Sequence, residues 1–170
     1  MSEDRREFLR RKYLSLGLGE LAAAVVFVVV AFTVAIPRLV GADDQAALWS
    51  ALVPLSVVLV QGGAYWLSAR AWVARASMPT SLATLYRAFR IVDVGLLGAG
   101  LVGIVLFLPD SRGATLFVVF IWLFGVIEYV NYFVFRLSYP LRQLPSRLTQ
   151  WRTPRLVQDL RSAGPWQTGP

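Results

Sequence analysis

Apolar residues along the chain gather into four long runs that polar segments separate. The runs cover about residues 14–36, 46–68, 86–108 and 114–135, and ionisable residues are rare inside them. A helix needs about 20 apolar residues to cross the roughly 30 Å hydrocarbon core of a bilayer, so every run is long enough. The pattern predicts an all-α polytopic membrane protein, built as an antiparallel bundle of four transmembrane helices.

The segments between the runs are short, which favours antiparallel neighbours. Residues 37–45 form the first connection, and Pro79 marks the start of the third helix. Residues 109–113 are long enough only for a tight turn. A signal peptide is the alternative for the first run, but the run is too long and lacks a small-x-small cleavage site. The predicted organisation is a basic N-terminal segment (1–13), a transmembrane domain (14–136) and an Arg-rich amphipathic tail (137–170).

The composition excludes several kinds of chemistry. The chain has 170 residues and contains no cysteine and no histidine. Disulfides, thiol catalysis, His-ligated haem and the usual zinc sites are therefore excluded, and we expect no metal and no cofactor. Lys12 is the single lysine among 17 basic residues, and this preference for arginine is typical of a GC-rich bacterial genome.

Basic residues are distributed very unequally between the two sides of the predicted bundle. One side holds 15 of them, and the other side holds only Arg38 and Arg112. By the positive-inside rule the richer side is cytoplasmic, so both termini are predicted to face the cytoplasm from the cell inner membrane. The net charge of +7 lies at helix ends beside apolar runs, which indicates anionic lipid of the inner leaflet as a partner, and not nucleic acid.

Each predicted helix places a polar residue at a similar depth. With a rise of 1.5 Å per residue, four side chains lie roughly 7–11 Å inside the cytoplasmic interface, namely Glu20, Gln61, Asp93 and Glu128. Asn131 follows Glu128 by three residues and therefore shares its helical face. Arg87 and Arg90 can reach the same layer from the start of the third helix. These residues form a predicted buried polar cluster.

This cluster has two interpretations. An isolated carboxylate in the membrane is costly, so each acidic group needs a partner or must be neutral. A salt-bridge network with the arginines would fix the helix register, and the near balance of charge slightly favours it. The alternative is a binding or proton-exchange site that opens to the cytoplasm.

Small residues recur at a spacing of four on the third helix, at Gly95, Ala99 and Gly103. Such rows allow helix backbones to approach closely in lipid. We expect the row to pack against another helix of the same bundle. A homodimer seam is the alternative.

The tail carries apolar residues at spacings of three and four, which is one face of a helix, namely Leu141, Leu144, Leu148 and Trp151. We expect this face to insert among lipid headgroups while four arginines contact anionic lipid, namely Arg142, Arg147, Arg152 and Arg155. Docking onto a protein partner is the alternative. Thr153-Pro154 predicts a new helix start.

The fourth run ends in Glu128-Tyr129-Val130-Asn131-Tyr132, followed by Arg136-Leu137-Ser138-Tyr139, and the tail contains the pair Asp159-Leu160. These features resemble a family of small uncharacterised bacterial, in particular actinobacterial, membrane proteins. In that family an E-Y-x-N-Y segment ends the last helix, and a basic tail closes with a D-L pair. The resemblance covers about the last third of the chain and implies the four-span architecture, with no activity to transfer.

Three classes of function fit the sequence to different degrees. The favoured one is a non-enzymatic membrane protein, an interaction, assembly or accessory subunit that binds a membrane partner and anionic lipid. The second is a small transporter or channel that uses Glu20, Asp93 or Glu128 as a coupling carboxylate. An enzyme acting on lipid headgroups is the least favoured, because no DxxD-type cluster is present.

Overall fold

The computed structural model describes residues 3–39, 41–72, 77–134 and 153–163. Four of its helices are long and apolar enough to cross a membrane, which confirms the predicted all-α, multi-pass fold. The elements are α1 (Glu3–Val30), the π-helical turn η1 (Ala31–Ala35), the 3₁₀ turn η2 (Ile36–Arg38), α2 (Ala42–Trp72), α3 (Thr80–Leu106), α4 (Arg112–Phe133) and the short helix α6 (Arg155–Ser162).

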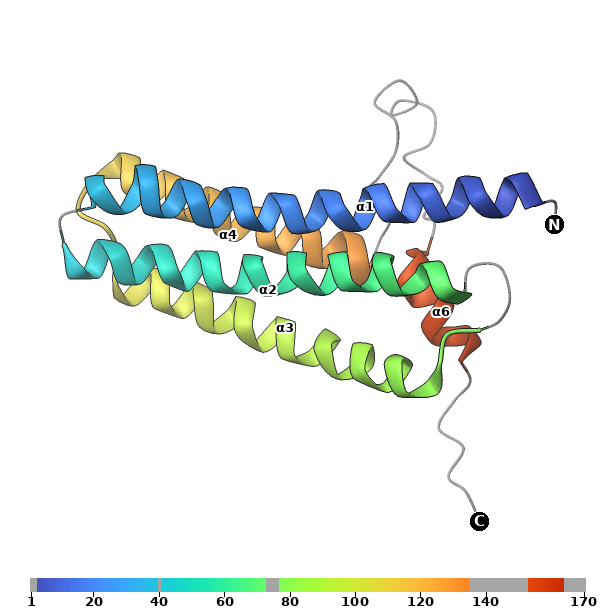
Figure 1. Cartoon of the computed structure of the whole chain (residues 1–170). Helices are drawn as coiled ribbons and strands as arrows, with labels where there is room; N and C mark the ends of the chain where they lie inside the picture. Colours follow the sequence, from blue (N-terminus) through green and yellow to red (C-terminus); the bar gives the residue numbers. More distant parts are fainter. Residues whose placement is uncertain (1–2, 40, 73–76, 135–152, 164–170) are drawn as a thin grey trace, which may run out of the picture.

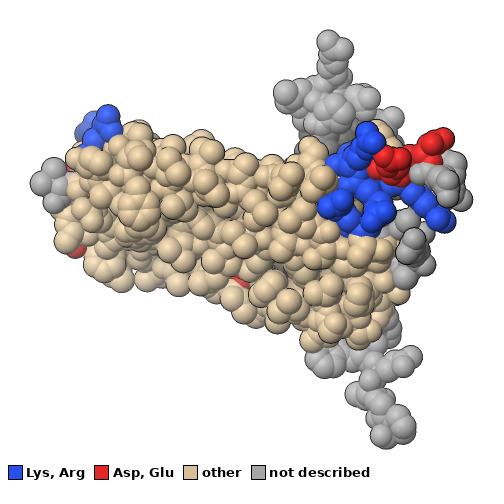
Figure 2. All heavy atoms as spheres, viewed as in Figure 1, with Lys and Arg blue, Asp and Glu red and all other residues tan. Residues whose placement is uncertain are grey.

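The four long helices lie side by side along the molecule, and α2 packs against each of the other three (Figure 1). The start of α1, the end of α2, the start of α3 and helix α6 meet at one end, which we call the basic end. Figure 2 shows Lys and Arg side chains gathered there, while the long middle of this face carries almost none. Arg38 and Arg112 lie at the opposite end.

α1 is longer than the first apolar run. It starts at Glu3 and continues without a break into the membrane-spanning part, so the predicted N-terminal segment and the first span share one helix. Arg, Lys and Glu are good helix formers, so a charged sequence can extend the helix beyond the apolar run. An exposed ion pair between Arg11 and Glu7, one turn apart, adds to this helix.

Two cores fill the bundle. In the half away from the basic end, the buried residues described are apolar, among them Leu48, Leu52, Leu55, Val118 and Ile121. At the basic end, the buried residues are largely aromatic, and the apolar side of α6 joins them. The second cluster contains Tyr13, Tyr65, Trp72, Tyr86, Tyr132, Phe133, Leu156 and Leu160. Polar aromatic groups are therefore available for hydrogen bonds at the basic end.

Glycines set the closest crossing of α1 and α2. A Cβ atom at Gly17 would lie 2.8 Å from the side chain of Leu67 and 3.0 Å from the carbonyl oxygen of Gly63. A Cβ atom at Gly63 would in turn lie 2.8 Å from Leu21 and 3.1 Å from the carbonyl oxygen of Gly17. The two backbones can approach this closely because neither position carries a side chain.

The crossing of α2 and α3 centres on Ser50. Pro54 lies inside α2 and has no N–H, so the carbonyl of Ser50 loses its usual partner four residues on. A Cβ atom at Gly100 would overlap this carbonyl oxygen, and one at Gly103 would overlap the Ser50 side chain. Gly100 and Gly103 are therefore the small residues of α3 that face α2.

Of the three small residues in the predicted row on α3, Gly103 lies against α2, and Gly95 and Ala99 do not contact another helix of the bundle closely. Gly95 and Ala99 are exposed, and a Cβ atom at Gly95 would meet nothing within 4 Å. A spacing of four drifts around a helix with 3.6 residues per turn, so Gly100, and not Ala99, lies over α2 with Gly103. The homodimer alternative for the exposed residues stays a prediction.

Candidate functional site

A chain of hydrogen bonds joins α1, α2 and α4 near the basic end. The hydroxyl of Tyr132 donates to Oε1 of Glu20 over 2.5 Å. The same hydroxyl accepts from the indole Nε1 of Trp66 at 3.2 Å. Gly62 leaves room for the ring, because a Cβ atom there would lie 2.5 Å from Cζ of Tyr132. Tyr132 thus connects the carboxyl of α1 to the indole of α2.

Glu128 belongs to the same neighbourhood. The side chain of Asn131 hydrogen-bonds to Glu128 one turn earlier in α4, and the Glu20 carboxyl lies close enough to interact with it electrostatically. Oε2 of Glu128 is buried and has no hydrogen-bond partner within the described part of the chain. Glu20, Glu128, Asn131, Tyr132 and Trp66 form what we call the α1–α4 polar cluster.

A second polar group lies between α2 and α3. Nε2 of Gln61 donates to Oδ1 of Asp93 over 3.0 Å, and the hydroxyl of Tyr86 donates to the backbone carbonyl of Gln61 over 3.0 Å. Asp93 is completely buried. Oε1 of Gln61 and Oδ2 of Asp93 are both buried without a hydrogen-bond partner among the described residues. Two acceptor atoms therefore lack donors here.

The structure divides the predicted polar layer into these two groups and gives each acidic residue a neutral partner. These partners are Tyr132 for Glu20, Gln61 for Asp93 and Asn131 for Glu128. The two arginines expected to neutralise them have other positions. Nη2 of Arg87 donates to the carbonyl of Leu160 in α6 over 3.0 Å, and Arg90 is exposed beside a groove. The contacts described thus give no support to the salt-bridge interpretation.

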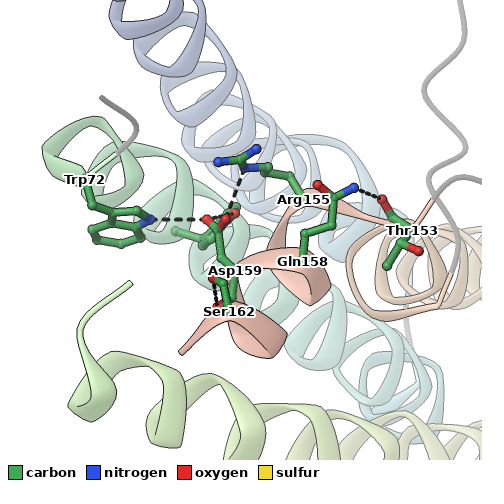
Figure 3. Close-up of polar contacts among 7 residues, drawn as sticks. Trp72, Thr153, Arg155, Gln158, Asp159 and Ser162 are labelled. Atoms are coloured by element: carbon green, nitrogen blue, oxygen red, sulfur yellow. Dashed lines mark hydrogen bonds and ion pairs between the residues drawn. The ribbon is translucent and has the colours of Figure 1, made fainter. Parts of the chain in front are cut away.

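Asp159 holds α6 against the end of α2 (Figure 3). Its Oδ2 accepts from the hydroxyl of Tyr65 at 2.8 Å and from Nε1 of Trp72 at 3.2 Å. Its Oδ1 lies 3.1 Å from Nε of Arg155, which is an ion-pair distance without hydrogen-bond alignment. The carboxyl is buried, so three partners compensate for the loss of water.

The apolar face predicted for the tail rests on residues 141–151, which lie outside the described residues, while helix α6 farther along the tail packs on the bundle. Leu156 and Leu160 are buried against the bundle and lie beside Asp159. Arg155 is half-buried and pairs with Asp159, so it does not point freely into lipid. An amphipathic face can cover a protein as well as a membrane, and here it covers the helices of its own chain. Arg142, Arg147 and Arg152 lie outside the described residues.

A cavity of about 180 Å³ separates α6 from the α1–α4 polar cluster. Its lining includes Glu20, Asn131 and Tyr132, together with the basic residues Lys12 and Arg155. It can hold a few water molecules or a small ion between acidic and basic groups. Within the described ranges, no three His, Cys, Asp or Glu side chains come together to hold a metal ion.

Sequence reasoning missed the contact between Asp159, Tyr65 and Trp72. The aromatic pair Tyr65-Trp66 has the position of a membrane-interface belt, and that pattern gives no sign of a specific partner. The one available signal was an acidic residue between Leu156 and Leu160 in a basic tail. An acid inside the apolar face of an amphipathic helix indicates a buried polar contact, because lipid offers it no partner.

Exchanging Glu128 for glutamine is expected to leave the free energy of unfolding unchanged within about 1 kcal/mol, or to raise it. Glutamine keeps an acceptor for Asn131, and it resembles the neutral acid without the repulsion that an ionised Glu128 would exert on Glu20. Thermal melting in detergent at neutral pH, with the exposed Glu7→Gln as control, measures the effect. A loss of about 3–5 kcal/mol would instead reveal a buried ion pair.

Comparison with protein-family models, with curated protein sequences and with solved structures finds no match to this chain. The resemblance carried by the Glu128–Tyr132 segment therefore stays a prediction.

Proposed function

We propose that the chain is a non-enzymatic protein of a bacterial inner membrane that binds a membrane protein partner and anionic lipid at its cytoplasmic end. The observation that carries the protein-binding part of this proposal is the unbroken course of α1 from its charged first turns into the membrane span. Arg5, Arg10, Arg11 and Lys12 are exposed on this part of the helix. A basic surface that is continuous with a transmembrane helix presents a fixed shape to a partner.

The packing of the other half of the bundle supports binding more than transport. Its buried residues in the described ranges are apolar and include Ala47, Leu48 and Ala51, none of which is exposed at all. A polar substrate that crossed the membrane would have to break this core. A binding protein needs no such path.

The proposal requires that both termini face the cytoplasm, and this orientation can be tested in whole cells. The chain has no cysteine, so single cysteines at Ser2, Ser111 and Ser162 give unambiguous labels. With both termini cytoplasmic, an impermeant thiol reagent on intact cells should label position 111 and should leave positions 2 and 162 unmodified until the cells are opened. The opposite pattern would overturn the orientation.

The partner test uses the charge of α1. Arg5→Gln with Arg10→Gln removes two exposed charges, and Arg112→Gln changes an exposed arginine at the other end. We expect a stoichiometric partner to co-purify in mild detergent with the wild type and with Arg112→Gln, and its yield to fall about tenfold for the α1 variant. Equal recovery with all three proteins would exclude the basic surface of α1 as the binding site.

A small carboxylate-dependent transporter is the second candidate. It is favoured by the position of Glu20 and Glu128 next to a polar cavity, with neutral side chains as their hydrogen-bond partners. Glutamine at position 128 mimics the neutral acid, so it would abolish proton-coupled uptake while the protein still folds. If the Glu128→Gln protein keeps the melting temperature of the wild type but loses uptake, this candidate is favoured over the partner-binding function.

A further inference from the structure

A groove with a volume of about 890 Å³ lies between α3, α4 and α6 at the basic end. It is separate from the α1–α4 polar cluster, and none of the acidic residues described above lines it. Three arginines contribute to its lining, two from α3 and one from α6, namely Arg87, Arg90 and Arg161. Tyr129 of α4 closes one side, and its hydroxyl donates to the backbone carbonyl of Arg90 over 3.2 Å.

The groove changes from basic to apolar along α3. Arg87, Arg90, Ile91 and Val94 have the spacing i, i+3, i+4, i+7, which places them on one face of the helix. Ile91 is 76% exposed and Val94 is 55% exposed, within the part of α3 that spans the membrane. The arginines therefore lie nearer the end of the span, and the apolar residues lie deeper.

One arginine of the groove is held by a hydrogen bond, and the other two are exposed. Arg87 donates to the carbonyl of Leu160, the residue before Arg161, so the contact fixes the end of α6 against α3. Arg90 and Arg161 are exposed, and neither forms an ion pair with an acidic side chain in the described part of the chain. Positive charge at the rim of an apolar groove matches a molecule with an anionic head and apolar chains.

We infer that this groove binds one anionic phospholipid, with its phosphate between Arg90 and Arg161 and its acyl chains along Ile91 and Val94. The order of charge along α3 supports a lipid over a soluble phosphate, because a soluble anion would leave Ile91 and Val94 without a role. Guanidinium groups suit a phosphate oxygen pair through bidentate hydrogen bonds. This inference rests on the lipid-binding part of the proposed function, which it makes more specific. It does not depend on the binding of a protein partner to α1.

The test measures lipid affinity of the purified, delipidated full chain in mild detergent. Phosphatidylglycerol is titrated against the wild type by native mass spectrometry, beside phosphatidylcholine with the same acyl chains and glycerol phosphate without them. We expect phosphatidylglycerol to bind at least about tenfold more tightly than the other two ligands. Arg90→Gln with Arg161→Gln should weaken its binding about thirtyfold, with no change in melting temperature measured without lipid.

Two further variants separate the groove from general charge. Arg5→Gln with Arg10→Gln removes the same charge from the same end of the molecule and should leave phosphatidylglycerol binding unchanged. Ile91→Trp keeps every arginine but fills the apolar part of the groove, and it should weaken binding about tenfold. The exposed position of Ile91 makes this change compatible with folding.

Three outcomes would overturn the inference. Equal affinity for phosphatidylglycerol and phosphatidylcholine would exclude recognition of charge. Equal affinity for glycerol phosphate would exclude a role for the acyl chains. An equal loss in the α1 and the groove variants would show diffuse attraction without a site. Absence of any co-purified protein from the wild type, with intact lipid binding, would contradict only partner binding on α1.

Discussion

Changing Asp159 to alanine is expected to release α6 from the bundle. The carboxyl accepts hydrogen bonds from Tyr65 and Trp72 and pairs with Arg155. Alanine would leave two buried donors without an acceptor, each at a cost of about 1–3 kcal/mol. We expect α6 docking to weaken by about 2–4 kcal/mol, which corresponds to roughly a 30- to 1,000-fold larger undocked population.

The accessibility of a buried cysteine measures this release. Leu156 is 2% exposed, so Leu156→Cys in the cysteine-free chain reports each opening of α6 to a thiol reagent. The labelling rate should rise strongly when Asp159→Ala is added, and less with Asp159→Asn, which keeps one acceptor oxygen. Asp110→Ala in the turn before α4 is the matched control. An unchanged rate for Asp159→Ala would mean that Leu156 and Leu160 hold α6 without the carboxyl.

Placing leucine at position 100 should be the most damaging single change on α3. Gly100 faces the Ser50 carbonyl of α2, and even a Cβ atom would overlap that backbone oxygen. A flexible side chain could move aside, but the backbone of α2 is fixed by its contacts with three helices. We expect a loss of about 3 kcal/mol in unfolding free energy and a much lower yield of monodisperse protein in detergent.

Gly95→Leu provides the matched control for Gly100→Leu. It is the same substitution on the same helix, at a position with nothing within 4 Å of the added Cβ atom. It should be neutral, or stabilising by up to about 1 kcal/mol, because leucine is the better helix former. A similar loss of yield at both positions would show that Gly95 packs against a second molecule.

Hydropathy alone predicted the four spans, because lipid solvation demands long apolar runs whatever the details of packing. It placed the helix boundaries less well. α1 begins at Glu3 and α2 extends from Ala42 to Trp72, since residues outside the lipid can continue a helix that is already formed. The fold class follows from composition along the chain, while the helix ends depend on local hydrogen bonding.

Spacing along the chain identifies the polar residues inside the predicted spans, but it does not identify their partners. Gln61 and Glu128 lie in the halves of α2 and α4 nearer the basic end, whereas Asp93 lies at the midpoint of α3 and Glu20 beyond the midpoint of α1. The partner depends on how far each helix rotates about its axis. Small differences in rotation decide whether Asp93 faces Gln61 of α2 or points away from it. Apolar spacing in the tail likewise suits a lipid surface and a protein surface equally well, so the docking of α6 needed the structure.

The docking of α6 has a consequence for how the protein is made. Its anchor points, Tyr65 and Trp72 on α2 and Arg87 on α3, are synthesised long before Asp159. They come together only after α2 and α3 have inserted and paired. Helix α6 can therefore dock only on a bundle that is already assembled, and its burial marks the completed state.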